Sequence, residues 1–177
     1  MHEIVLPDSV KPALEWINNR VVPKVSPKPL HALAQARFAT ALGAWADERG
    51  KGMVGTEMHF QVRPLGEIGR TLVPDVAFVS FERVPVKTLE SNEVPHAAPD
   101  VVVEVRSPDD LQADIDEKVR VYLASGTRVL FLVDPERKDV QVVDVTGLRV
   151  VREPDVVTHE SLEGFSLPVA TLFRLRS

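Results

Sequence analysis

The sequence contains no cysteine, and no apolar run in it approaches the roughly 20 residues that a membrane-spanning helix requires. The lack of cysteine excludes disulfides, thiolate zinc sites and cysteine nucleophiles, and it fits a reducing cytosol. A basic-then-apolar signal pattern is also missing from the start of the chain, so we expect a cytoplasmic protein. Positive charge is not in excess: the net charge of −5 counts against non-specific coating of nucleic acid, although it leaves local contact through a metal ion open.

Several signatures of nucleotide-binding and hydrolytic enzymes are absent as well, namely the Walker loop, the dinucleotide fingerprint and the serine-hydrolase elbow. What remains is the composition of one soluble globular domain, with 177 residues of which 44% are hydrophobic and 27% charged. We divide the chain into an N-terminal helical or extended segment, residues 1–25, and a single domain over residues 26–177.

Hydrophobic periodicity predicts the secondary structure along the chain. Helices are expected at residues 8–19, 29–49 and 107–125. Strands are expected at 54–63, 72–80, 101–106, 128–133 and 140–145, with an extension of the sheet at 149–152. A polar loop should occupy 81–98, and an irregular segment should cover the domain at 162–168. This order predicts an α/β fold with a mixed central β-sheet flanked by helices.

Two carboxylates stand in segments that have the pattern of buried strands. Asp75 follows Val73 and Pro74, and Glu104 lies within the valine-rich run 101–106, whose pattern indicates that both faces are covered. An ionised carboxylate buried without a partner would cost several kcal/mol or become neutral. Carboxylates at such positions therefore commonly bind a metal ion or pair with a cation.

Strand parity allows these two side chains to meet. Glu104 and Arg106 project from the same face of their strand, and Asp75 is the polar group on a face that it shares with Val73, Ala77 and Val79. If the two strands are neighbours, Asp75 and Glu104 converge on one ion. Oxygen ligands of this kind select a hard cation, which predicts Mg²⁺ or Mn²⁺.

A cation is directed toward the same place from the third predicted helix. On a helical wheel of about 100° per residue, Lys118 falls at the edge of the apolar stripe rather than on the solvent face. An inward ammonium needs an anionic partner, and Glu104 or a bound phosphate would serve. A structural alternative stays open, in which Asp75, Glu104, Arg106 and Lys118 form a salt-bridge cluster, or Lys118 pairs with Asp114 or extends to solvent.

An ordered set of motifs resembles the Uma-two family of restriction-endonuclease-type proteins, which belong to the PD-(D/E)XK nuclease superfamily. The resemblance covers roughly residues 25–170, from Ser26 and His31 to the closing segment 164–168. Its motifs are Val73-Pro74-Asp75, Ala98-Pro99-Asp100 leading to Glu104 and Ser107-Pro108, the helix segment Asp116-Glu117-Lys118 to Gly126, and Phe131 to Asp134-Pro135. It implies a restriction-endonuclease-like fold.

The resemblance also implies roles for individual residues. Asp75 and Glu104 would be the metal ligands, with the backbone carbonyl of Val105 as a third. The superfamily's usual lysine, two residues after the glutamate, is Arg106 here, and arginine stays protonated and cannot act as a general base. Arg106 could still bind a phosphate or stabilise charge in the transition state. Lys118 is the expected substitute for the missing lysine.

Other polar residues are weaker candidates. Glu57 could supply a further ligand, His31 could face the cleft and Asp114 could orient Lys118, but each also fits a solvated surface position. Trp45 fits the core. The remaining histidines have no metal-ligand spacing: His2, His59, His96 and His159.

Three functional hypotheses follow. The leading one is a Mg²⁺-dependent endonuclease that hydrolyses DNA phosphodiester bonds. A catalytically inactive, nuclease-like scaffold used for binding or assembly is the main alternative, supported by the acidic charge balance and by Arg106 in the lysine position. The third keeps the metal chemistry but acts on RNA or a small phosphoester. An exposed strand edge and two-strand cutting would favour a homodimer.

Overall fold

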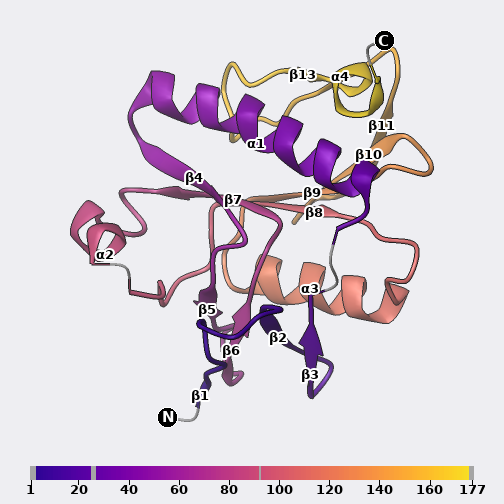
Figure 1. Ribbon diagram of the computed structural model, residues 1–177. Helices are drawn as coiled ribbons and strands as arrows, with labels where there is room; N and C mark the ends of the chain where they lie inside the picture. The colour runs from indigo at the N-terminus through magenta and orange to yellow at the C-terminus, as the bar shows by residue number, and fades with distance from the viewer. Residues whose placement is uncertain (1–2, 25–26, 92, 176–177) are drawn as a thin grey trace.

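The computed structural model describes residues 3–24, 27–91 and 93–175. Its centre is a mixed six-stranded sheet in the order β11-β10-β9-β8-β7-β4 (Figure 1). β8 and β9 pair in parallel, and the other neighbours in this sheet pair antiparallel. The bounds are β4 (Gly52–Thr56), β7 (Val76–Ser80), β8 (Val101–Val105), β9 (Val129–Asp134), β10 (Asp139–Asp144) and β11 (Gly147–Arg152). The predicted α/β fold with a mixed central sheet is therefore confirmed.

One face of the sheet is covered by α1 (Pro29–Arg49), which has the predicted bounds. Proline at its start needs no N–H partner, and Gly50 ends it in the left-handed conformation with φ of 59°. Phe38 and Leu42 of α1 are fully buried, and the ring of Phe38 lies 5.1 Å from that of Phe131 on β9. The C-terminal segment, with β12 (Val156–Val157), β13 (Leu167–Pro168) and α4 (Val169–Phe173), completes this layer beside α1 (Figure 1).

The opposite face is covered by α3 (Gln112–Ala124), whose Val121 and Tyr122 are buried against Val102 and Leu130 of the sheet. Apolar residues on both faces explain the consecutive valines of β8: Val101, Val103 and Val105 belong to the core under α1, whereas Val102 belongs to the core under α3. Glu104 shares the parity of Val102, so its side chain is directed to the α3 side.

A smaller layer stands below this second face (Figure 1). It consists of the three-stranded sheet β1-β6-β5 and the hairpin β2-β3. The bounds are β1 (Glu3–Ile4), β2 (Leu14–Ile17), β3 (Arg20–Pro23), β5 (Phe60–Val62) and β6 (Gly69–Leu72). β2 packs on both β6 and α3.

The helix predicted at residues 8–19 was wrong, because this region contains the β2-β3 hairpin instead. Its turn is formed by Asn18 and Asn19, with φ of 49° and 60°. Two consecutive residues with positive φ are the requirement of a tight hairpin turn, and asparagine tolerates that conformation. The apolar spacing of Leu14 and Ile17 fits either a helix or a strand, and the turn residues are what favour the hairpin.

Other boundaries differ from the predictions for local reasons. The single strand predicted at 54–63 is two strands, β4 and β5, separated at Glu57, whose φ is 52°. The strand predicted at 72–80 breaks at Pro74, which cannot donate a ladder hydrogen bond. The third helix begins at Gln112 rather than Ser107, and the loop at 81–98 contains the short helix α2 (Val86–Glu90).

Candidate active site

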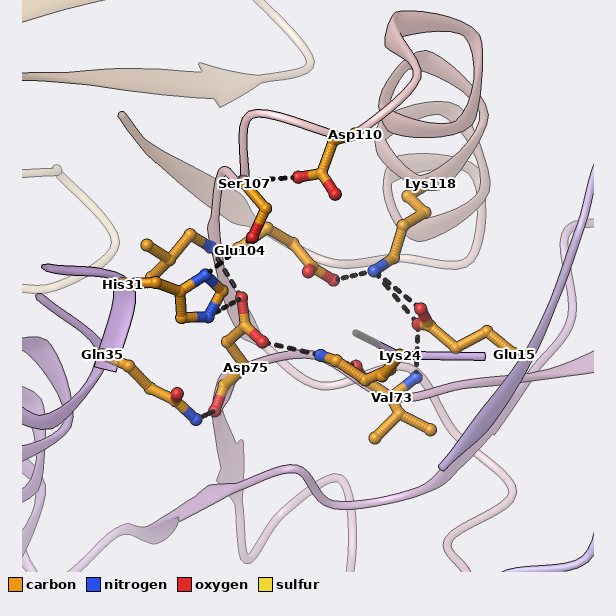
Figure 2. Close-up of polar contacts among 11 residues, drawn as sticks. Glu15, Lys24, His31, Gln35, Val73, Asp75, Glu104, Ser107, Asp110 and Lys118 are labelled. Atoms are coloured by element: carbon orange, nitrogen blue, oxygen red, sulfur yellow. Dashed lines mark hydrogen bonds and ion pairs between the residues drawn. The ribbon is translucent and has the colours of Figure 1, made fainter. Parts of the chain in front are cut away.

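The predicted pair of carboxylates meets where β7 and β8 run side by side. Val76 lies opposite Val103 in this antiparallel pairing, so Asp75, which precedes β7, reaches the position facing Glu104. Asp75 Oδ2 accepts a 2.7 Å hydrogen bond from the backbone N–H of Val105. Figure 2 shows Asp75, Glu104 and Lys118 gathered in one cluster, as parity and the helical wheel predict.

Asp75 is held by groups from three parts of the chain. Lys24 Nζ lies 2.7 Å from Asp75 Oδ1, and His31 Nε2 lies 3.5 Å from Oδ2. Gln35 donates to the Asp75 backbone carbonyl at 3.1 Å. Burial raises the pKa of the Asp75 carboxyl, but the charge of Lys24 and the hydrogen bond and charge of His31 outweigh burial and hold the pKa well below its ordinary value.

Glu104 pairs with Lys118, whose Nζ lies 2.7 Å from Glu104 Oε1 and 3.1 Å from Glu15. Burial is the largest influence on Glu104 and, together with the nearby carboxylates, raises its pKa to about 7 despite Lys118. Burial alone would lower the pKa of Lys118, yet Glu104 and Glu15 outweigh it and raise that pKa. Lys118 therefore stays protonated beside a carboxyl that titrates near neutrality.

Two members of this cluster, Glu15 and Lys24, were not predicted, because Glu15 fell in the helix expected at 8–19 and Lys24 in the proline-rich segment that follows it. Glu15 lies on β2, is 3% exposed, and accepts a 2.8 Å hydrogen bond from the backbone N–H of Val73. Lys24 directly follows β3 and also donates to the Val73 carbonyl at 2.7 Å. The Asn18-Asn19 pair between two short apolar segments was the signal that could have found the hairpin.

Arg106 lies at the rim of the site rather than among the buried charges. Its guanidinium donates to Gln112 Oε1 at 3.0 Å, and its side chain lines the same cavity as Glu104. His31 Nδ1 lies 3.2 Å from Ser107 Oγ, and the Ser107 N–H donates to Asp110 at 2.7 Å. His31 thus faces the cleft and connects Asp75 to the segment that leads into α3.

The cluster lies at the base of a cavity of about 290 Å³ between the hairpin and α3. Its walls include apolar side chains of both elements, among them Ile17, Val22 and Ile115. Asn18 and Arg20 of the hairpin both bind the Asp114 carboxylate on α3, so Asp114 attaches the hairpin to α3, whereas Lys118 pairs with Glu104 and Glu15. The Asp75 and Glu104 side chains are largely shielded from solvent, with exposed fractions of 4% and 15%.

Apart from His31 and Asp114, which line the cavity, the weaker candidates lie elsewhere. Glu57 and His59 line a separate hollow that also includes Met53 and Leu89, and burial lowers the pKa of His59. His96 lies 3.7 Å from Glu3, and His159 lies 3.0 Å from Asp144. Trp45 borders the α1 core and donates to the Glu163 carbonyl. His2 and Ser26 lie outside the described residues.

The donor set fits a hard divalent cation. Within residues 3–24, 27–91 and 93–175, no group of three or more His, Cys, Asp or Glu side chains is arranged to hold a metal ion. A site here would therefore use the carboxylates of Asp75 and Glu104, with a backbone oxygen such as that of Val105. Mg²⁺ is commonly bound by one or two carboxylates and completed by water and substrate phosphates, so two carboxylates suffice.

The fold and the cluster define a nuclease-like α/β protein, and comparison with known proteins agrees. The chain belongs to the Uma-two family: the family model, described as "Putative restriction endonuclease", matches residues 4–170. A crystal structure described as "a putative nuclease" from Anabaena variabilis is similar, with a TM-score of 0.81 and 25% sequence identity. That alignment covers 95% of this chain and 93% of the other. No curated protein matches the chain.

These comparisons confirm the family resemblance and the restriction-endonuclease-like fold. They also support a nuclease, which is a hydrolase acting on nucleic acid. None of the helices in the described part of the chain has the length and apolar character that crossing a membrane would take. The division of the chain at residue 25 stays a prediction.

Proposed function

We propose that the chain is a divalent-metal-dependent endonuclease that hydrolyses phosphodiester bonds in DNA, with Mg²⁺ or Mn²⁺ held by Asp75 and Glu104. The observation that carries this proposal is the meeting of Asp75, Glu104 and Lys118 at the base of one cavity. The proposal is supported by the match to a family described as "Putative restriction endonuclease".

The residues of the chain supply distinct contributions. A bound Mg²⁺ would lower the pKa of a coordinated water and polarise the phosphoryl group. Lys118 would orient the attacking water or neutralise charge that develops on the phosphate, since its ammonium remains protonated. Arg106, at the rim, would bind an adjacent phosphate through its guanidinium. It cannot act as the general base, because arginine does not lose its proton.

One alternative is favoured by a specific observation: both carboxylates already have ammonium partners at 2.7 Å. A cluster neutralised in this way could be purely structural, in a scaffold that binds a partner without cleaving it. Arg106 in the position of the usual lysine agrees with that alternative. Metal binding distinguishes the nuclease from the scaffold. In a purely structural cluster the carboxylates stay paired with Lys24 and Lys118 and bind no metal cation.

The decisive experiment is calorimetric titration of Mg²⁺ and Mn²⁺ into the wild type and Glu104→Gln, with plasmid nicking measured on the same samples. We expect the wild type to bind metal and nick the plasmid, and Glu104→Gln to lose both. Glu90→Gln, on the exposed surface of α2, is the matched control and should behave as the wild type.

The outcomes separate the candidate functions. If the protein binds metal and cleaves RNA or short model phosphodiesters but not the plasmid, its substrate is another phosphoester rather than DNA. No metal binding by the wild type would contradict the nuclease proposal and leave the scaffold as the better account.

A homodimer is a further proposal, supported by the exposed Leu148 and Val150 on the edge strand β11. A cytoplasmic location stays a prediction.

A further inference from the structure

Lys24 differs from Lys118 in the number of carboxylates that it contacts. Lys118 Nζ lies within 3.1 Å of both Glu104 and Glu15. Among the described residues, Lys24 forms a direct ion pair with Asp75 alone, at 2.7 Å, and donates to the neutral carbonyl of Val73, while Glu104 and Glu15 act on it without direct contact. The Lys24 side chain is only 15% exposed, so solvent replaces a lost partner poorly.

This difference becomes important if Asp75 and Glu104 bind a metal cation. Lys118 would lose Glu104 but keep Glu15, which is itself fixed by the Val73 N–H. Lys24 would lose the one carboxylate that it contacts directly and keep the Val73 carbonyl oxygen, since Glu15 acts on Lys24 without direct contact and is itself paired with Lys118. A buried ammonium without an anion in direct contact is unfavourable, so Lys24 would then gain from a new anionic partner. Since Lys24 lines the same cavity as Asp75, a phosphate entering that cavity is the anion within reach.

We infer that Lys24 is the internal counter-ion of Asp75 in the metal-free protein and the phosphate-binding residue of the metal-loaded site. This inference rests on the proposed function. Lys24 thereby opposes binding of a cation at Asp75 when no phosphate is present, and it favours the cation when a phosphate occupies the cavity. Metal and phosphodiester thus bind cooperatively, and Lys24 is the group that couples them.

The test is calorimetry of Mn²⁺ at one fixed pH, with and without the dinucleotide pTpT. Lys24→Gln removes the charge but keeps a donor for Val73, Lys24→Arg keeps the charge, and Lys87→Gln on exposed α2 is the control. Without pTpT, we expect Lys24→Gln to bind Mn²⁺ about tenfold more tightly than the wild type, a typical size for a coupling between sites. Adding pTpT should tighten Mn²⁺ binding to the wild type, and much less to Lys24→Gln.

Thermal unfolding provides a second measurement that does not depend on cleavage. Without metal, the melting temperature of Lys24→Gln should be lower than that of the wild type, because Asp75 loses its counter-ion. Saturating Mn²⁺ should raise the melting temperature of Lys24→Gln more than that of the wild type. Lys24→Arg keeps the charge and should resemble the wild type in both measurements. This variant can still be measured if Lys24→Gln folds poorly.

The result that overturns the inference is specific to Lys24. If the wild type binds Mn²⁺ and Lys24→Gln binds it equally or more weakly, or if pTpT tightens binding equally in both, Lys24 is not the coupling group and the nuclease proposal stands. If the wild type binds no Mn²⁺ with or without pTpT, the proposed function and this inference both fail.

Discussion

Glu15 and Lys118 form an ion pair at 3.1 Å although 103 positions separate them in the chain. Glu15 comes from the β2-β3 hairpin and Lys118 from α3, so the pair joins the N-terminal segment to the helix that covers the site. Glu15 also accepts the Val73 N–H, close to Asp75. The hairpin is therefore part of the site and not merely an extension of the domain.

Removal of Glu15 is expected to destabilise the protein. Glu15→Ala leaves the buried Val73 N–H without its acceptor and takes one carboxylate from Lys118, which should lower the free energy of unfolding by roughly 3 kcal/mol. Glu15→Gln keeps an acceptor for Val73 and should lose less. Urea unfolding measures both. Glu48→Ala is the control, since the Glu48 side chain is 79% exposed, and a loss from Glu15→Ala no larger than from this control would refute the prediction.

Lys118→Met should impair cleavage far more than metal binding. The ammonium is expected to act on the water or the phosphate, and loss of one such electrostatic contact typically costs about 10²–10³ in rate. Mn²⁺ affinity should not fall, because Lys118 competes with the cation for Glu104. Single-turnover cleavage and calorimetry on the same preparation test this pair of effects. Lys51→Met, at an exposed position, is the control, and an unchanged cleavage rate in Lys118→Met would remove Lys118 from the mechanism.

The pH dependence of stability should include a contribution from Glu67 and Glu117. A hydrogen bond from Arg120 is the first cause that holds the pKa of each carboxyl below its ordinary value of 4.5, and Arg70 adds to it. Groups with a lowered folded-state pKa stabilise the fold above about pH 4.5, and this contribution is lost as pH falls through the folded-state pKa. The wild type should therefore lose stability on acidification more steeply than the double variant Glu67→Gln/Glu117→Gln.

Thermal melts from pH 7 to pH 3 provide the measurement. The double variant should be less stable at pH 7 and should converge toward the wild type at the acid end. The difference should be modest and should shrink with added salt, because Glu67 and Arg120 are partly exposed. Parallel curves for the two proteins over this range would show that these carboxylates do not contribute.

Two glycines should respond to alanine in opposite directions. A Cβ at Gly52, at the start of β4, would lie 2.4 Å from the Val79 carbonyl oxygen and 2.5 Å from the Phe78 ring. Gly52→Ala should therefore cost about 2–3 kcal/mol by overpacking. Gly43, inside α1, has no atom within 4 Å of its added Cβ, and Gly43→Ala should stabilise by about 0.5–1 kcal/mol. Equal melting temperatures of the two variants would contradict this.

Local periodicity along the chain is enough to predict the parts of the site that follow from a strand or helix repeat. Alternation along the strand directs Glu104 and Arg106 to one face, and the helical period directs Lys118 inward, so these orientations could be predicted without tertiary contacts. The bounds of α1 were equally predictable, because proline begins it and Gly50 ends it. The consecutive valines of β8 predicted correctly that both faces of that strand are covered.

Which distant groups complete the cluster depends on contacts between segments that are far apart in the chain. Glu15 lies in a short hairpin whose apolar spacing is equally compatible with a helix, and Lys24 directly follows it. Only the packing of the hairpin on β6 and α3 brings these residues to Lys118 and Asp75. The same packing decides that both ammoniums have carboxylate partners and that Asp75 is almost fully shielded. The physical reason is that burial and ion pairing depend on contacts between segments far apart in the chain, which no local periodicity encodes.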